Sequence, residues 1–210
     1  EATEAKQHGN PPGSEEQIFG KHTTHIAAAD SKGNWGALTT TVNTSFGSKI
    51  IVPGTGVILN NQMDDFSLAP GVPNAFGLIG AEANRIEPGK RPLSSMSPTI
   101  VLQEGRPILT LGAAGGPKII SQVVLTILRV VDRGMTLREA VSAPRFHHQW
   151  RPDRLFIERS AGKWSLSEKT LDVLQRSGHT LAPLDYTGAT QCVGYDSDGN
   201  LIGIAEPRLP

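Results

Sequence analysis

The feature that most restricts the fold of this chain is a repeated pattern of two strand-like runs joined by a short turn. The runs THIAAAD and WGALTTTVN flank the turn at residues 30–34, which has the sequence DSKGN. The same arrangement recurs around EGRP at 104–107 and around SDGN at 197–200. Strand-forming runs on either side of turns rich in Asp, Asn and Gly are typical of β-hairpins. Three such hairpins predict antiparallel sheet.

Three helices are predicted between and after these hairpins. Residues 118–134 are mostly apolar, which predicts a helix buried between layers. Residues 165–178 predict an amphipathic helix whose first turn carries a capping box formed by Ser165 and Glu168. A shorter helix is expected over 136–143, before a proline. Antiparallel sheet combined with buried helices indicates a layered α+β domain.

Two segments differ in composition from the rest of the chain. Residues 1–22 are polar and contain few large apolar side chains, so they are expected to form a linker or tail, followed by one folded domain over 23–210. Residues 53–98 contain six of the fifteen prolines and few periodic stretches. A long irregular segment inside a compact domain is more often functional than idle.

Composition argues against several classes of function. Lys plus Arg and Asp plus Glu both number 20, so there is no positive charge excess for binding nucleic acid or an anionic membrane. No apolar run reaches the length needed to span a bilayer, and no signal peptide is evident at residue 1. Cys192 is the only cysteine, so the fold does not depend on an internal disulfide.

The run LGAAGGPKII predicts a strand that enters a glycine-rich turn and then a helix. Gly115 and Gly116 would let the backbone approach a ligand closely, and the helix start would offer unpaired N–H groups to an anion. The spacing fits neither a nucleotide P-loop nor a dinucleotide fingerprint. An oxyanion hole, which needs only two N–H donors, and a purely structural tight turn both remain open.

Other polar clusters permit several interpretations. The run LNNQMDDF ends in Asp64 and Asp65, which could serve acid–base chemistry, hold an ammonium group or form a polar turn, while the spacing excludes an EF-hand. Ser94 and Ser95 lie outside a G-x-S-x-G elbow. The adjacent pair at 147–148, both histidines, would point to opposite faces of a strand, so no metal site is expected there.

Thr23 lies where the polar leader ends and the first strand begins. A threonine hydroxyl is a poor nucleophile unless a base accepts its proton, and a free α-amino group on the same residue can do so. That chemistry requires cleavage of the bond between His22 and Thr23. Threonine is also common at strand starts, so the pattern alone supports either interpretation.

Together these motifs resemble the small, C-terminal subunit of the gamma-glutamyltranspeptidase family, which belongs to the N-terminal nucleophile hydrolases. The resemblance covers about residues 20–208 and implies a four-layer αββα sandwich with antiparallel sheets. The segments that carry it, in order, are TTHIAAADSKGN, TTTVNTSFGS, GVILNNQMDDFS, PGVPNAFGL, KRPLSSMSPTIV, GAAGGPKII and APRFHHQW.

The resemblance implies a role for each matched residue. Thr23 would be the nucleophile of both autocleavage and catalysis, oriented by Thr41, and Gly115 and Gly116 would supply the oxyanion-hole N–H groups. The residues implied to bind the γ-glutamyl donor are Asn43, Gln62 and Asp65 at its α-amino group, and Ser94 and Ser95 at its α-carboxylate.

The resemblance also implies partners and a location. The chain would pair with a large subunit from the same precursor, of which residues 1–22 would be the tail, and it would need no cofactor and no metal. It would transfer a γ-glutamyl group from glutathione or another γ-glutamyl amide to water, an amino acid or a dipeptide. The family is usually exported, so a periplasmic or extracellular location is expected, with the signal on the large subunit. Phe76 occupies a lid position where many bacterial relatives carry a tyrosine, and it cannot donate the tyrosine's hydrogen bond to Asn43.

Two alternative functions stay open. Related acylases of the same fold act on glutaryl side chains of β-lactams, and because a glutaryl group has no α-amino group, such an enzyme would not need Asp65. A non-catalytic fragment lacking its large subunit is the other alternative.

Overall fold

The computed structural model describes residues 23–69, 71–149, 152–160, 163–184 and 188–209. The predicted linker, 1–22, lies outside the described residues. Within them the predicted α+β class is confirmed and all three predicted hairpins form; the sheets are antiparallel, as predicted, except for one parallel pair that joins residues 155–158 to 181–184.

The first hairpin is a two-stranded ribbon made of β1 (Thr23–Ala29) and β2 (Trp35–Thr41). Its register pairs Thr23 with Thr41 at one end and Ala29 with Trp35 at the turn. Asp30 closes this turn, because its carboxylate accepts hydrogen bonds from the backbone of residues 32 and 34. The side chains alternate between a half-buried or buried face and an exposed face, as expected for a strand pair packed on one side.

The other two hairpins share one four-stranded sheet in the order β10–β9–β4–β3. Its strands are β3 (Thr99–Gln103), β4 (Arg106–Ala114), β9 (Ala189–Tyr195) and β10 (Leu201–Ile204). The turn between β3 and β4 is made by Glu104 and Gly105, which both have positive φ angles of 50° and 79°. Two positive φ angles match the strand twist and explain the tight connection.

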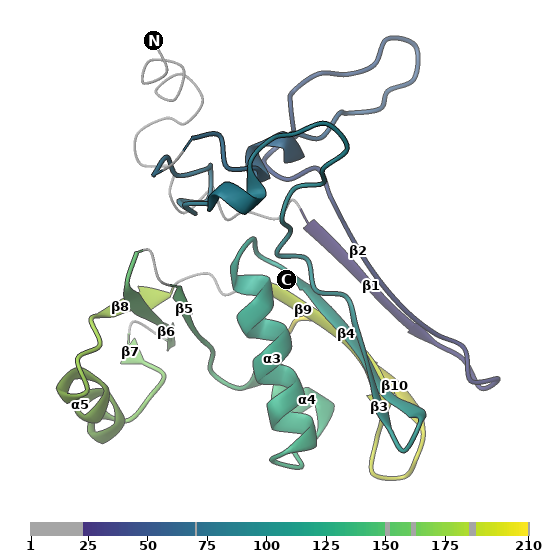
Figure 1. The fold of residues 1–210 in the computed structure, drawn as a ribbon. Coiled ribbons are helices and arrows are strands. Elements are labelled where there is room, and N and C mark those ends of the chain that lie inside the picture. The colour runs from purple at the N-terminus through teal and green to yellow at the C-terminus, as the bar shows by residue number, and fades with distance from the viewer. Residues whose placement is uncertain (1–22, 70, 150–151, 161–162, 185–187, 210) are drawn as a thin grey trace.

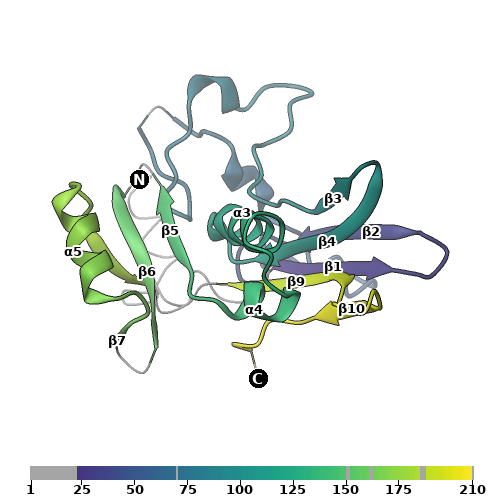
Figure 2. The same ribbon diagram turned by 90° about the horizontal axis from the view of Figure 1, so that it is seen from below.

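The ribbon lies against one face of this sheet, and helices cover the other (Figures 1 and 2). On the ribbon side the Thr110 hydroxyl donates to the Gly36 carbonyl across the layers, and the His25 ring packs over Gly112. On the other side lie α3 (Lys118–Val131) and α4 (Leu137–Ser142). Thr136 and Glu139 form a capping box at the start of α4. The helix ends before Pro144, as predicted.

The hydrophobic core fills the space between the four-stranded sheet and these helices. It combines alternate residues of β4 with the inner face of α3, and its members are Leu109, Leu111, Ala113, Ile119, Val123, Leu137, Val141, Cys192 and Ile204. Burial raises the pKa of the Cys192 thiol to about 12, so this cysteine is a packing residue, as expected.

The prediction that the 118–134 helix is buried between layers is wrong within the described residues, because only one of its faces is covered. The outer face of α3 exposes Ile120, Val124 and Leu128 by 45–50%. These residues are one helical turn apart and form an apolar stripe with Val131. Within the described residues no layer covers this stripe.

A smaller group of elements lies beside the helices. It contains β5 (Phe146–Gln149), β6 (Arg154–Ser160), β7 (Lys163–Trp164), β8 (Leu181–Leu184) and α5 (Glu168–Arg176). The predicted capping box of Ser165 and Glu168 is wrong. Ser167 is the N-cap and accepts from the Thr170 amide, so the helix begins two residues later than the Ser165 pattern suggested.

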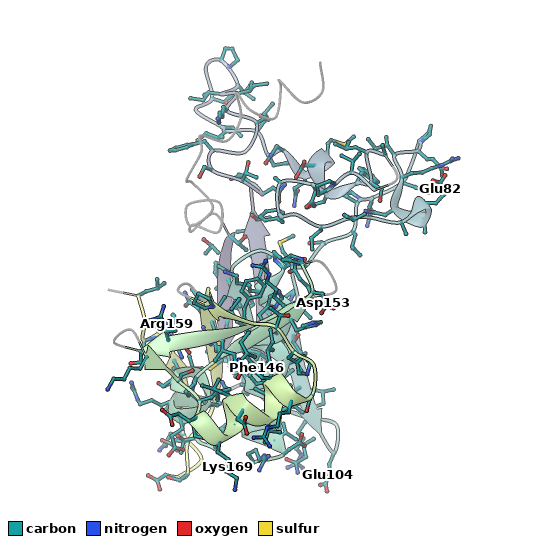
Figure 3. All side chains as sticks on the ribbon, turned by 90° about the vertical axis from the view of Figure 1, so that its left-hand side faces the viewer. Glu82, Glu104, Phe146, Asp153, Arg159 and Lys169 are labelled. Atoms are coloured by element: carbon teal, nitrogen blue, oxygen red, sulfur yellow. The ribbon has the colours of Figure 1, made fainter. Side chains whose placement is uncertain are left out.

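The irregular segment predicted over 53–98 begins earlier in the structure, soon after β2, and covers 43–98. Apart from isolated bridges, its described residues contain only two short 3-10 helices, η1 (Gln62–Asp65) and η2 (Glu82–Asn84). In Figure 3 Glu82 lies at the outer end of this segment, far from Phe146 and Lys169 on the opposite part of the molecule. Among the described helices, none has both the length and the apolar character to cross a membrane.

Candidate active site

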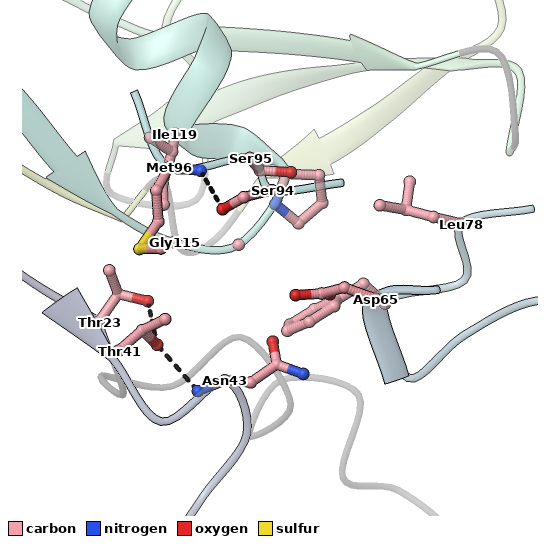
Figure 4. A pocket seen from close by; sticks show the side chains of 13 residues that line it. Thr23, Thr41, Asn43, Asp65, Leu78, Ser94, Ser95, Met96, Gly115 and Ile119 are labelled. Atoms are coloured by element: carbon pink, nitrogen blue, oxygen red, sulfur yellow. Dashed lines mark hydrogen bonds between the residues drawn. The ribbon is translucent and has the colours of Figure 1, made fainter. Parts of the chain in front are cut away.

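An open cavity lies where the ribbon, the irregular segment and the start of α3 meet (Figure 4). Its walls therefore come from parts of the chain that are far apart in sequence. The lining residues are Thr23, Thr41, Asn43, Asp65, Phe76, Leu78, Ser94, Ser95, Met96, Gly115, Gly116, Pro117 and Ile119.

Thr23 is the first residue of β1, and its side chain is directed into the cavity (Figure 4). Its hydroxyl donates to the Thr41 hydroxyl, which is 3.0 Å away on the paired strand. The Thr41 hydroxyl oxygen also accepts a hydrogen bond from the backbone N–H of Asn43 at 3.0 Å. Because the ribbon register places Thr23 opposite Thr41, the hairpin itself fixes this hydrogen-bonded pair.

Asn43 follows the ribbon and turns the chain into the irregular segment. Its φ of 77° lies in the left-handed region, which asparagine tolerates better than most residues. The side chain is buried, and its amide nitrogen donates to the Asn61 carbonyl at 3.3 Å. Asn61 in turn accepts from the Thr44 amide, so the two asparagines join the ribbon to the loop before η1.

Asp65 faces Thr23 from the opposite side of the cavity (Figure 4). Burial, and to a lesser degree the neighbouring Asp64, raises the pKa of Asp65 to about 6. No cationic partner of Asp65 is found among the residues that the structure describes, and a half-buried carboxylate of this kind gains from binding a positive group. Asp64 has a structural role instead: its carboxylate accepts a hydrogen bond from the Ala75 backbone N–H and so holds the loop that carries Phe76.

Ser94 and Ser95 line the cavity from the segment before β3. The Ser94 hydroxyl accepts from the Met96 amide at 3.2 Å. Asn84 joins this wall to the Asp65 wall, since its side chain donates to the Asp65 carbonyl at 2.7 Å and accepts from the Leu93 amide at 2.9 Å. One side chain therefore joins the two backbone segments that carry Asp65 and the serine pair.

Gly115 and Gly116 form the turn between β4 and α3, at the edge of the cavity nearest Thr23 (Figure 4). Both have positive φ angles, 138° and 59°, which favour glycine. Their carbonyl groups are used by the helix start, because Lys118 N–H donates to the Gly115 carbonyl and Ile119 N–H to the Gly116 carbonyl.

The structure gathers nearly all of the residues that the family resemblance singled out. Every one of them lines the cavity except Gln62, which begins η1 and whose backbone amide donates to the Asn60 side chain. His22, on the other side of the predicted cleavage bond, lies outside the described residues. Phe76 lines the cavity at the predicted lid position.

Sequence reasoning missed the apolar part of the lining and the residues behind it. Leu78, Met96 and Ile119 give the cavity an apolar wall, and no local pattern marked them. No sequence pattern pointed to Asn84 either. Gln122 could have been found from the sequence, because it is a neutral amide in the middle of an otherwise apolar helix, and a buried amide needs hydrogen-bond partners.

The two histidines at 147 and 148 point to opposite sides of β5, as their adjacency predicts. His147 is buried, and its ring contacts the Ser121 hydroxyl and the Gln149 side chain. His148 is exposed and pairs with Asp153. Across the described part of the chain, no group of three or more His, Cys, Asp or Glu side chains is placed to hold a metal ion.

Comparison with known proteins identifies the family. The sequence model of the gamma-glutamyltranspeptidase family matches residues 1–210. The glutathione hydrolase proenzyme of Escherichia coli is 45% identical over 197 residues, which cover 94% of this chain and 33% of that protein. A crystal structure of a Helicobacter pylori gamma-glutamyltranspeptidase mutant is 43% identical with a TM-score of 0.82, covering 89% of this chain and all of that one.

A more distant structure is also similar. Cephalosporin acylase from Bacillus halodurans is 26% identical with a TM-score of 0.71, over 88% of this chain and 32% of that protein. The fold is thus that of the N-terminal nucleophile hydrolases, as the sequence predicted. The chain belongs to the gamma-glutamyltranspeptidase family, and it spans about a third of the length of the glutathione hydrolase proenzymes it matches.

Proposed function

We propose that this chain is the catalytic part of an enzyme that transfers or hydrolyses γ-glutamyl groups through a threonyl acyl-enzyme. One observation carries the proposal: the Thr23 hydroxyl, the Gly115–Gly116 turn, Asp65 and the two serines all line one cavity, with Asp65 across it from Thr23. A nucleophile and N–H donors that share a cavity with groups for an amino acid's two charges suit a donor that reacts at its γ-carbonyl.

The proposed reaction has two steps. Thr23 Oγ1 attacks the γ-amide carbonyl carbon while its proton passes to the Thr23 α-amino group. The N–H groups of Gly115 and Gly116 would stabilise the oxyanion. Collapse breaks the C–N bond, the proton moves to the leaving amine, and a γ-glutamyl ester remains on Thr23. Water or the amine of an acceptor then attacks this ester, giving glutamate or a new γ-glutamyl amide and regenerating the threonine.

Recognition of the donor would follow from charge. Asp65, with help from Asn43, would bind the α-ammonium group, and Gln62, which does not line the cavity, would contribute least. Ser94 and Ser95 would donate hydrogen bonds to the α-carboxylate. An ammonium beside Asp65 would offset the burial that keeps the pKa of this carboxyl high.

The proposed nucleophile becomes available only when the bond between His22 and Thr23 is cleaved, since the α-amino group is otherwise part of a peptide bond. The partner is proposed to be the remainder of a longer precursor. Two uncovered apolar faces support this: the outer face of the ribbon, where paired Ile26 and Leu38 are 53% and 57% exposed, and the outer stripe of α3.

Substitution of Thr23 tests the function directly, in the full precursor rather than in this segment alone. Thr23→Ala should abolish cleavage before residue 23 and lower γ-glutamyl anilide turnover by about 10⁴-fold or more, because it removes the attacking oxygen. Thr24→Ala is the matched control, since Thr24 points to the exposed face of the same strand and should change turnover only a few-fold. Normal cleavage in Thr23→Ala would overturn the proposal.

The similarity to cephalosporin acylase supports a second candidate, a glutaryl acylase built on the same fold. The two differ at Asp65, which has a use only when the substrate carries an α-ammonium group. Matched γ-glutamyl and glutaryl anilides separate them. Preference for the γ-glutamyl compound, lost in Asp65→Asn, supports transfer of γ-glutamyl groups, whereas preference for the glutaryl compound would establish the acylase.

A further inference from the structure

Gln122 is a buried amide on α3 that contacts the turn carrying Gly115 and Gly116. Its residue exposure is 2%, although its neighbours on the helix are mostly apolar. Its Nε2 donates to the Ala114 carbonyl at 3.0 Å, and its Oε1 accepts from the Thr190 hydroxyl at 3.0 Å and from Arg145 at 3.2 Å. Three hydrogen bonds offset the cost of burying this amide.

The bond to Ala114 controls the direction of one particular N–H group. A peptide unit is planar and trans, so its C=O and N–H point in opposite directions. The Ala114 carbonyl shares its peptide plane with the Gly115 N–H. Because Gln122 binds this carbonyl from the buried side, the Gly115 N–H is directed to the other side of the turn, where Gly115 lines the cavity.

The neighbouring N–H group is fixed in a different way. The Gly116 N–H shares its peptide plane with the Gly115 carbonyl, which accepts from the Lys118 backbone at 3.3 Å. The start of α3 therefore orients the second N–H through backbone alone. The first N–H depends on a side chain, and that side chain is Gln122.

Close packing leaves the amide little room to move. A Cβ on Gly115 would lie 3.0 Å from Gln122 Nε2, and a Cβ on Gly188 would lie 2.3 Å from it. Both glycines have positive φ angles, 138° and 88°. The amide is thus enclosed between two backbone segments that approach it closely because they lack side chains.

The orientation of the amide is also determined by its partners. Arg145 and the Thr190 hydroxyl are donors toward Oε1, so a flipped amide would place its NH₂ group against a guanidinium. Arg145 is itself held at 2.7 Å by Glu206, which also accepts from the Thr190 backbone. This buried network, made of Gln122, Arg145, Thr190 and Glu206, fixes which end of the amide meets Ala114.

We propose that Gln122 is a positioning residue that holds the Ala114–Gly115 peptide so that the Gly115 N–H faces the oxyanion formed at the Thr23 adduct, a role that rests on the proposed function. Gln122 touches no reacting atom and acts only through the turn. Its loss should weaken stabilisation of the tetrahedral species while leaving donor binding, which uses the side chains of Asp65, Ser94 and Ser95, unchanged.

The decisive variant is Gln122→Glu in the matured two-subunit enzyme, with rates normalised to the amount of chain that begins at Thr23. Glutamate keeps the volume and both acceptor bonds but cannot donate to Ala114 when ionised. We expect kcat for a γ-glutamyl anilide to fall about 10–100-fold, which is below the loss from deleting a whole oxyanion donor because the N–H is misdirected rather than removed. KM should stay within about twofold, since binding and transition-state contacts are separate here.

Thr126→Val is the matched control for stability. Thr126 is also buried on α3, and its hydroxyl donates to the Gln122 backbone carbonyl at 2.8 Å without touching the turn. It should lower Tm with little change in kcat. Gln122→Met serves as a second variant, because it has no charge to bury and also lacks the donor.

Inhibitors give a readout that a merely structural role would not move. A γ-boronic acid analogue of glutamate, which forms a tetrahedral adduct on Thr23, should lose affinity in Gln122→Glu by about the factor lost in kcat, whereas L-glutamate should not. If Gln122→Glu and Gln122→Met lose no more kcat than Thr126→Val does for the same fall in Tm, the proposed role of Gln122 is overturned. A wild-type enzyme without γ-glutamyl turnover would instead overturn the proposed function.

Discussion

The two sides of the candidate active site are supported very differently. The turn at Gly115 is attached to β4, in which every residue from Leu109 to Ala114 is buried. The donor side is carried by residues 43–98, where, among those the structure describes, only Asn43, Gly47, Phe66 and Ser67 are buried. One side is held by a hydrophobic core and a buried ion pair, and the other mainly by turns and side-chain-to-backbone hydrogen bonds.

This difference shows which part of the site the chain can organise by itself. The side that carries the Gly115 turn, the proposed oxyanion side, is enclosed by the sheet, α3 and the Arg145–Glu206 pair. The donor side exposes large apolar residues, including Phe46 at 68% and Leu93 at 68%, and thus has surface available for a partner. We infer that assembly with the rest of the precursor would mainly stabilise the donor side.

The largest effect is expected from breaking the buried network on the oxyanion side. Glu206→Gln leaves the Arg145 guanidinium, which is 2% exposed, without its carboxylate. Stability should fall by about 3–5 kcal/mol, measured by denaturant unfolding. Asp172→Asn, which breaks the exposed pair with Arg176, is the control and should cost about 0.5 kcal/mol or less.

The same variant makes a prediction about acid stability. Burial alone would raise the pKa of Glu206, but Arg145, the Thr190 amide and Arg208 hold it below its usual value of 4.5. A carboxyl with a depressed pKa stabilises the fold above its unfolded pKa, and this contribution is lost as the pH falls through the folded value. Wild-type stability should therefore drop below about pH 4.5, with a smaller drop in Glu206→Gln. An identical acid profile in both proteins would contradict this.

The second effect concerns the contact between the ribbon and the sheet. A Cβ at Gly112 would lie 2.2 Å from the His25 ring, two residues from Thr23, so Gly112→Ala must displace this ring or the ribbon that carries it. The cost should be about 1–3 kcal/mol of stability, as for overpacking in a core, together with reduced turnover. Adding His25→Ala removes the opposing ring. The double variant should therefore be less destabilised than the sum of the two single variants, and strict additivity would rule out this contact as the cause.

The smallest effect is a pH dependence on the donor side. The pKa of Asp65, raised to about 6 by burial and then by Asp64, means that the carboxyl loses its charge as the pH falls below 6. Because the proposed ammonium contact needs that charge, kcat/KM for a γ-glutamyl anilide should fall toward about tenfold per pH unit below this value. Asp64→Asn removes the second cause of the raised Asp65 pKa, so the fall in kcat/KM on the acid side of the pH profile (the acid limb) should move to lower pH. An acid limb that does not move would show that another group controls it.

Local sequence patterns predicted the elements well where short-range chemistry decides them. The three hairpins follow from their glycine-containing turns, and the end of α4 follows from the stop at Pro144. The N-cap of α5 was misplaced because Ser165 and Ser167 offer competing caps, and only Ser167 has the geometry to accept from the helix. The apolar run of α3 predicted a helix correctly, but its outer face is uncovered in this chain.

For the site, motif resemblance found the residues but could not place them. That Thr23 lies opposite Thr41 follows from hairpin register, a property of neighbouring strands. That Asp65 and the pair at 94–95 share one cavity, joined by Asn84, depends on the path of an irregular segment that no periodicity describes.

By itself, the sequence determined the α+β class, the hairpins, the glycine turn and the family to which the chain belongs. Turns, caps and glycine positions act over a few residues, so they can be read directly from the order of amino acids. Only the tertiary structure decided that the Gln122 amide binds the Ala114 carbonyl, that Glu206 fixes Arg145 behind it, and that Asp65 is buried enough to keep a high pKa. These features join residues from separate elements, and burial and orientation exist only once those elements have packed together.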